Sequence, residues 1–188
     1  MMSLVGLLVV VALLFAANDL RQSQVSYHRA TLLAERNQIA DSCMQAAKKF
    51  AFERGRSNVV LRSQGPISPE NRRFIEEKRT ATDKYIFDTL GRLPDESRKA
   101  GDELRRAWNV VKTLRPDVDH DFALSPAERD PALPGLWMAA ANDLVAGLEA
   151  LLVTISDLPG NIEVSFDRLI RLRVLSVQLR NLVGSESI

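Results

Sequence analysis

The chain has 188 residues, of which 25 are basic and 24 are acidic, so its formal net charge at pH 7 is +1. This balance gives no electrostatic reason to expect nucleic acid or an acidic polymer as a partner. The single cysteine, Cys43, excludes an internal disulfide and a cysteine metal cluster. The chain is long enough for one domain with a hydrophobic core of its own.

The first 17 residues, Met1 to Ala17, contain no charged side chain. As a helix they would be about 25 Å long, near the lower limit for crossing the hydrocarbon core of a bilayer. A cleaved signal peptide is the alternative, but a basic N-terminal region is missing and Phe15-Ala16-Ala17-Asn18 is a poor cleavage sequence. We therefore expect residues 1–18 to be a transmembrane anchor, the sole candidate span, and residues 19–188 to be one extracytoplasmic domain.

Apolar residues repeat with the period of an α-helix along most of the chain, and the alternating runs typical of strands are missing. The first helix should continue from the membrane to about Leu61. Its core-facing positions on the helical spacing are Leu32, Ile39, Cys43, Ala46, Phe50, Glu53, Ser57 and Val60. Gln64-Gly65-Pro66 ends this helix, and Ser68-Pro69 is the start signal of a second helix. Pro94-Asp95-Glu96 separates the second helix from a third, which we expect to end at Pro116.

Residues 115–134 contain four prolines and are predicted to form the longest irregular stretch. A heptad pattern then predicts a helix that closes at Pro159-Gly160, and Asn161 can cap a last helix that reaches about Val183. The core positions of the heptad are Trp137, Ala141, Leu144, Leu148, Leu151, Ile155 and Leu158. We predict an all-α protein, an elongated antiparallel bundle of the four-helix type that is continuous with the N-terminal transmembrane helix.

The segment Phe52-Glu53-Arg54-Gly55-Arg56-Ser57-Asn58 interrupts the apolar pattern of the first helix. Glu53 falls on a core-facing position, and a buried carboxylate needs a cationic partner, either Arg54 or an arginine of a facing helix. Gly55 lies inside the helix, where glycine costs about 1 kcal/mol relative to alanine. Two interpretations stay open. One is a structural ion pair with close helix contact at Gly55, and the other is a pocket in which Arg54 binds a small anion or carboxylate.

Two further pairs of residues are candidates for a ligand site. Arg79 and Asp83 are four residues apart on the second helix, which is also the spacing of an ordinary surface ion pair. Arg173 and Arg180 are seven residues apart and share one face of the last helix. That face could be the core seam, but a shift of the seam by one residue would turn both arginines outward.

The sequence carries no catalytic or metal motif of comparable strength. Asp117 to Glu128 matches the acidic positions of a calcium loop, but Phe122 stands where the turn needs glycine and Pro126 interrupts the loop. A P-loop, a dinucleotide fingerprint and a Gly-x-Ser-x-Gly elbow are all missing. We therefore expect neither enzymatic activity nor a bound metal or cofactor.

Short motifs carry a resemblance to a known family. Glu53-Arg54-Gly55-x-Ser57 and Arg79-x-x-x-Asp83 resemble the helical nitrate- and nitrite-sensing domain and related extracytoplasmic sensor modules of bacterial signalling receptors. The ending Leu179 to Ser187 is similar to the ending of those modules, with departures at Asn181 and Ser187. In that family, arginines of the first and last helices form the anion site, which by matching motif implicates Arg54 and Arg180.

The resemblance implies a sensor of a small anion, nitrate-like, nitrite-like or a carboxylate, that precedes a chemoreceptor, histidine kinase or diguanylate cyclase output. We expect a homodimer in the inner (cytoplasmic) membrane, with the domain in the periplasm and the output beyond Ile188. The alternative is a membrane-anchored helical interaction or structural module without a small-molecule ligand. The candidate ligand-binding residues are Arg54, Arg180, Glu53, Arg79, Asp83 and Arg173.

Overall fold

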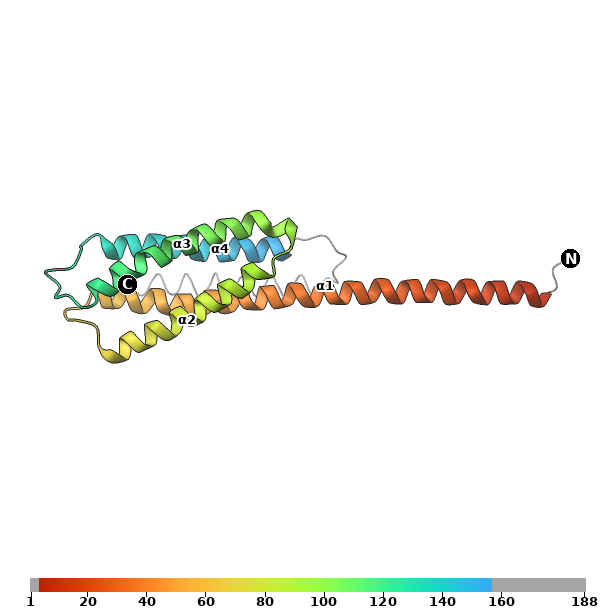
Figure 1. The fold of residues 1–188 in the computed structure, drawn as a ribbon, viewed down its shortest axis with the longest axis horizontal. Helices are drawn as coiled ribbons and strands as arrows, with labels where there is room; N and C mark the ends of the chain where they lie inside the picture. Colours follow the sequence, from red (N-terminus) through yellow and green to blue (C-terminus); the bar gives the residue numbers. More distant parts are fainter. Residues whose placement is uncertain (1–3, 157–188) are drawn as a thin grey trace. The chain divides into compact units, whose positions relative to one another are not determined.

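Figure 1 shows the fold in a computed structural model, which describes residues 4–156, with side chains from residue 13 onward. These residues form four α-helices and one short 3-10 helix, and none of them lies in a strand: α1 (Leu4–Leu61), α2 (Pro69–Gly91), η1 (Asp95–Ser97), α3 (Arg98–Asp121) and α4 (Leu133–Ser156). The predicted all-α class is confirmed for this part of the chain. The predicted last helix, with Arg173 and Arg180, lies outside the described residues.

The chain divides into two compact units, Met1–Gln38 and Ile39–Ile188. The described part of the first unit is a single stretch of α1, and it exposes Leu13, Leu14 and Phe15 at the end of the apolar run. Leu32, which follows the spacing of the core positions, is 53% exposed. A lone helix has no second element in its own unit against which such a side chain can be buried.

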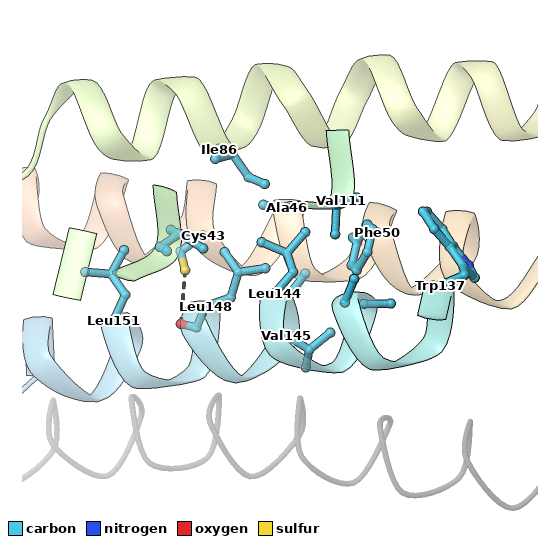
Figure 2. Packing of buried hydrophobic residues seen from close by; sticks show 14 of the residues in the cluster. Cys43, Ala46, Phe50, Ile86, Val111, Trp137, Leu144, Val145, Leu148 and Leu151 are labelled. Atoms are coloured by element: carbon cyan, nitrogen blue, oxygen red, sulfur yellow. Dashed lines mark hydrogen bonds between the residues drawn. The ribbon is translucent and has the colours of Figure 1, made fainter. Parts of the chain in front are cut away.

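The second unit contains a hydrophobic core to which α1, α2, α3 and α4 all contribute (Figure 2). The predicted heptad of α4 is confirmed from Trp137 to Ile155, because each of its positions is at most 2% exposed. On α1 the buried positions include Cys43, Ala46 and Phe50, as the spacing predicted. The rings of Phe50 and Trp137 meet edge to face, with centroids 6.2 Å apart. The spacing of apolar residues thus located both helix faces correctly.

Cys43 is an inert part of this core. Its thiol is fully buried and donates a hydrogen bond to the carbonyl oxygen of Leu148, at 3.4 Å (Figure 2). Burial raises the pKa of the Cys43 thiol to about 12. The reactive thiolate is therefore scarce at neutral pH.

The start of α2 agrees with its sequence signal. Ser68 accepts a hydrogen bond at its Oγ from the backbone N–H of Asn71, at 3.2 Å, and Pro69 is the first helical residue. The hydroxyl satisfies one of the free N–H groups of the first turn, and proline sacrifices no hydrogen bond there.

The predicted end of the third helix at Pro116 is wrong, because α3 continues through this proline to Asp121. A proline inside a helix removes one backbone hydrogen bond and crowds the preceding turn. Val118 and Phe122 are both nearly fully buried, and their packing in the core offsets part of that cost. The irregular stretch predicted for residues 115–134 is therefore limited to the connection between α3 and α4.

Arg129, in that connection, caps the end of α1. The Nη1 and Nη2 groups of its guanidinium donate to four backbone carbonyl oxygens at distances from 2.6 to 3.1 Å: those of Val60, Leu61, Ser63 and Gly65. The last carbonyls of a helix have no partner within the helix, and a cation also suits the negative end of the helix dipole. Arg129 thereby joins the α3–α4 connection to the turn that follows α1.

Among the described residues, no helix makes a close contact at Gly55, contrary to one of the two interpretations of its position. A Cβ atom built at Gly55 would meet no atom of the described residues within 4 Å. A close approach occurs instead at Gly147 of α4, where a Cβ atom would lie 3.4 Å from the Cα atom of Leu104. Glycine therefore allows the close approach of α3 and α4 at Gly147, while no packing within residues 4–156 explains the cost of Gly55 in α1.

By length and composition, α4 is a candidate membrane span, with a mean hydropathy of 1.5 over its most apolar stretch. The expectation that the N-terminal run is the sole candidate is therefore wrong. Ten residues of α4 are buried in the second unit. A core helix of a water-soluble domain meets the same criteria of length and composition.

The assignment of α4 as a core helix can be tested at two of its leucines. Leu144→Ala removes a fully buried side chain and should lower the free energy of unfolding by about 2–5 kcal/mol. Leu136, which is 52% exposed, provides the control, and Leu136→Ala should change it by less than about 0.5 kcal/mol. Denaturant unfolding of the full chain in detergent micelles, followed by circular dichroism, measures both. Equal effects at the two positions would contradict the described packing.

Candidate functional site

Glu53 is the centre of a buried ion-pair network that joins three helices. Its side chain, on α1, is 0% exposed, so the predicted core-facing position is confirmed. Arg115 of α3 donates to both carboxylate oxygens, from Nε to Oε1 and from Nη2 to Oε2, each at 2.8 Å. Arg79 of α2 donates from Nε to Oε1 at 3.2 Å. The partners of Glu53 are thus arginines of facing helices and not Arg54.

Two aspartates at the edge of the network hold the same arginines. Asp83 accepts hydrogen bonds at 2.8 Å on both oxygens from Nη1 of Arg115, and one at 3.1 Å from the indole N–H of Trp108. Asp119 accepts two bonds from Arg79, at 2.7 and 3.0 Å. The side chains of Asp83 and Asp119 are 36% and 39% exposed. Water therefore reaches the edge of the network but not its centre.

The network crosses between α2 and α3 in a regular way. Arg79 and Asp83 are four residues apart on α2, and Arg115 and Asp119 are four apart on α3. Each arginine binds the aspartate of the other helix, so Arg79 and Asp83 do not form the ordinary surface pair that their spacing allowed. This crossed pairing requires the two helices to run in opposite directions along this contact.

Burial raises the pKa of Glu53, while the nearby charge of Arg115 and its hydrogen bonds act in the opposite direction, followed by those of Arg79. Transfer of a carboxylate out of water is costly unless it is paired and hydrogen-bonded. The three N–H groups that donate to Glu53 belong to arginine side chains, which offer no acceptor. The hydrogen bonds therefore favour the carboxylate against the effect of burial, and they fix the rotation of α1 about its own axis.

Arg54 follows Glu53 in the sequence but faces α4. It is 7% exposed, its Nη1 donates to Oδ1 of Asn142 at 3.2 Å, and its backbone carbonyl accepts from the indole N–H of Trp137 at 3.3 Å. Within the described part of the chain, no carboxylate pairs with Arg54. Burial lowers the pKa of its guanidinium. Arg54 is thus a desolvated cation with a neutral partner.

The structure brings Glu53, Arg79 and Asp83 into one network and places Arg54 on a different side of α1. Arg173 and Arg180 lie outside the described residues. Sequence reasoning missed Arg115 and Asp119 because it placed both in the irregular stretch 115–134, which hid their helical spacing. Trp108 lay within the predicted helix, and nothing local indicated its bond to Asp83. The available signal was the Arg-x-x-x-Asp spacing of residues 115–119, which repeats that of residues 79–83.

The calcium-loop pattern has another explanation in the structure. Asp119 binds Arg79, Asp121 accepts the backbone N–H of Asp130 at 3.0 Å, and Glu128 accepts the hydroxyl of Ser125 at 2.7 Å. Among the described residues, no group of acidic, histidine or cysteine side chains could hold a metal ion. The carboxylates of this segment therefore serve as ion-pair and turn partners.

Comparisons of the chain with protein-family models, with curated proteins and with solved structures found no match. The resemblance to nitrate-sensing modules consequently depends on the short motifs alone. Of these, Glu53–Ser57 and Arg79–Asp83 lie in the described part of the chain and meet at the bond between Arg79 and Glu53.

The structural role of the network can be tested by removal of one arginine. Arg115→Ala leaves Glu53 buried with Arg79 as its remaining ionic partner and should lower the free energy of unfolding by about 3–5 kcal/mol. Arg105 pairs with Asp102 on the exposed side of the same helix, so Arg105→Ala is the matched control, with an effect of at most about 1 kcal/mol. Denaturant unfolding compares the two variants. A small effect of Arg115→Ala would show that Glu53 does not depend on this partner.

Proposed function

We propose that this chain is the ligand-sensing domain of a bacterial transmembrane signalling receptor. In this proposal residues 1–18 anchor it in the inner membrane, and an elongated antiparallel four-helix bundle faces the periplasm and pairs with a second copy. The domain binds a small anion and passes a helix rearrangement to a cytoplasmic output beyond Ile188. The proposal is supported by the all-α class and by α1, which runs unbroken from Leu4 to Leu61.

The observation that carries the proposal is the state of Arg54. A guanidinium that is removed from water is stabilised best by an anion that accepts two parallel hydrogen bonds. The partner of Arg54 in the described chain, the amide oxygen of Asn142, offers neither a charge nor a second acceptor. A nitrate, nitrite or carboxylate group would supply both. The cation is available for such a ligand because Glu53 is occupied elsewhere.

Glu53 and Arg54 lie on the same turn of α1 but contact different helices. Glu53 binds α2 and α3, whereas Arg54 contacts α4 through Asn142 and Trp137. A ligand at Arg54 would therefore act on the turn that fixes α1 to the other helices. Such a ligand shifts the packing of α1 only by the difference in its affinity for the two arrangements.

A second candidate function is a helical module that binds another protein and has no small-molecule ligand. It is favoured by Phe52 and Val59, which are 47% and 63% exposed on α1, one turn on either side of the open surface at Gly55. Exposed apolar residues that are this close together often mark contact surfaces. A response to small anions separates the two functions.

Thermal melting of the full chain with nitrate, nitrite and small carboxylates tests the proposal, with chloride as the control for ionic strength. A ligand that binds the folded state should raise the Tm of the wild type. Arg54→Ala should lose this rise and change the Tm without ligand only slightly, since it removes a buried cation with a neutral partner. Arg56→Ala, at an exposed neighbouring arginine, should keep the rise. If no anion shifts the wild type, the interaction module becomes the better interpretation.

Topology is tested by reporter fusions in a bacterial cell, one after Gly65 and one after Ile188. With α1 as the sole span, both reporters should show activity on the extracytoplasmic side. If α4 also crossed the membrane, the two fusions would report opposite sides. The pair of fusions therefore shows whether α4 crosses the membrane in addition to the N-terminal segment.

A further inference from the structure

Among the described residues, the network around Glu53 contains one more carboxylate than guanidinium group. Three carboxylates, those of Glu53, Asp83 and Asp119, meet two guanidinium groups, those of Arg79 and Arg115. Each aspartate has two hydrogen bonds to one arginine and remains partly in water. Glu53 shares both arginines and has no contact with solvent. The excess charge is therefore least favourable on Glu53.

The charged groups that face Glu53 come from two helices. On α2 they are Arg79 and Asp83, and on α3 they are Arg115 and Asp119. On α1 the neighbouring Arg54 is directed to Asn142, and the described residues form no ion pair between α4 and the network. Lys112 lies over the ring of Trp108, with its Nζ 3.8 Å from the ring centre. The printed contact of this cation is therefore with Trp108, which donates to Asp83 at the edge of the network, and not with Glu53.

Ser57 gives independent support for a second protonation state. It lies four residues after Glu53, hence on the same face of α1, and is 0% exposed. Its Oγ has no hydrogen-bond partner among the described residues. A protonated carboxyl group needs an acceptor, and arginines offer none. The hydroxyl of Ser57 can accept such a bond. Of the three buried hydroxyls without a partner among the described residues, those of Ser57, Thr89 and Ser97, it is the one on the same helix face as Glu53.

We propose that Glu53 takes up one proton from solvent and then exchanges its bonds to Arg115 and Arg79 for a bond from its acid O–H to Oγ of Ser57. The arginines keep their bonds to Asp83 and Asp119, so two cations and two anions remain. Bonds between α1 and its neighbours are replaced by one within α1, which frees this helix to move against α2 and α3. Burial raises the pKa of Glu53, which also favours the protonated form. The proposal does not depend on an anion at Arg54.

Infrared spectroscopy of the full chain in detergent micelles can follow this proton directly, through the carbonyl stretch of a protonated carboxylic acid. The wild type should show a band that Glu53→Gln lacks, with a midpoint above the usual glutamate pKa of about 4.3. Asp119→Asn removes the excess charge and should move the midpoint to lower pH by about one unit or more. A midpoint at the usual value, or one that Asp119→Asn leaves in place, would overturn the proposal.

Two further variants separate the proposed exchange from simple burial. Ser57→Ala removes the acceptor of the acid O–H and should also move the midpoint to lower pH, while the ion pairs keep the fold intact at neutral pH. Asp102→Asn removes an exposed aspartate paired with Arg105 and should leave the midpoint unchanged. An unchanged midpoint in Ser57→Ala would refute the role of Ser57.

Melting curves provide a second readout with a defined sign. A folded state with a raised pKa binds the proton more tightly than the unfolded chain does, so stability increases as pH falls from the folded to the unfolded pKa of Glu53. The Tm of the wild type should therefore rise relative to that of Glu53→Gln over this window and stay parallel to it outside. Parallel curves at every pH would contradict the proposal.

Discussion

One buried carboxylate determines how α1 is placed in the second unit. A hydrophobic face alone allows a helix to rotate by some degrees, because apolar contacts have little directionality. Glu53 removes this freedom, since its two oxygens must meet two guanidinium groups from different helices. With Glu53 fixed between α2 and α3, the next residue along the helix, Arg54, is turned toward α4. The orientation of the candidate ligand residue is therefore a consequence of the ion pairs.

The same constraint gives a reason for the unusual course of α3. Arg115 and Asp119 bind partners on α1 and α2 only if they share one helical face, and that requires regular helix on both sides of Pro116. A proline inside a helix costs about 3 kcal/mol. Loss of one partner of a buried ion pair costs as much or more. A break at Pro116 would separate charged partners and expose Val118 and Phe122, so the ion pairs and the burial of these two side chains favour a continuous helix.

Local signals in the sequence predicted most of the fold, whereas the pairing of distant residues was beyond them. The cap at Ser68, the heptad of α4 and the buried position of Glu53 each follow from spacing or from residues within one turn. The helical state of residues 116–121 does not follow from local signals, because it depends on ion pairs with residues far away in the sequence. Asp119 pairs with Arg79, 40 residues away, and Arg115 pairs with Glu53, 62 residues away. The predicted core-facing position of Leu32 was wrong for a related reason: periodicity identifies the apolar face of a helix but not whether another helix covers it. Periodicity therefore located the helices, and long-range charge pairing assembled the site.

Adjacent residues of α1 carry opposite charges that the described chain leaves uncompensated. Arg54 has one positive charge beside a neutral amide, and the network around Glu53 has one excess negative charge. Opposite charges attract even where, as among the described residues, neither group is a hydrogen-bond partner of the other. An anion that neutralised Arg54 would remove this attraction and make protonation of Glu53 more favourable. By reciprocity, protonation of Glu53 would favour the anion, so under both proposals the two events are linked in free energy even though they involve different faces of α1.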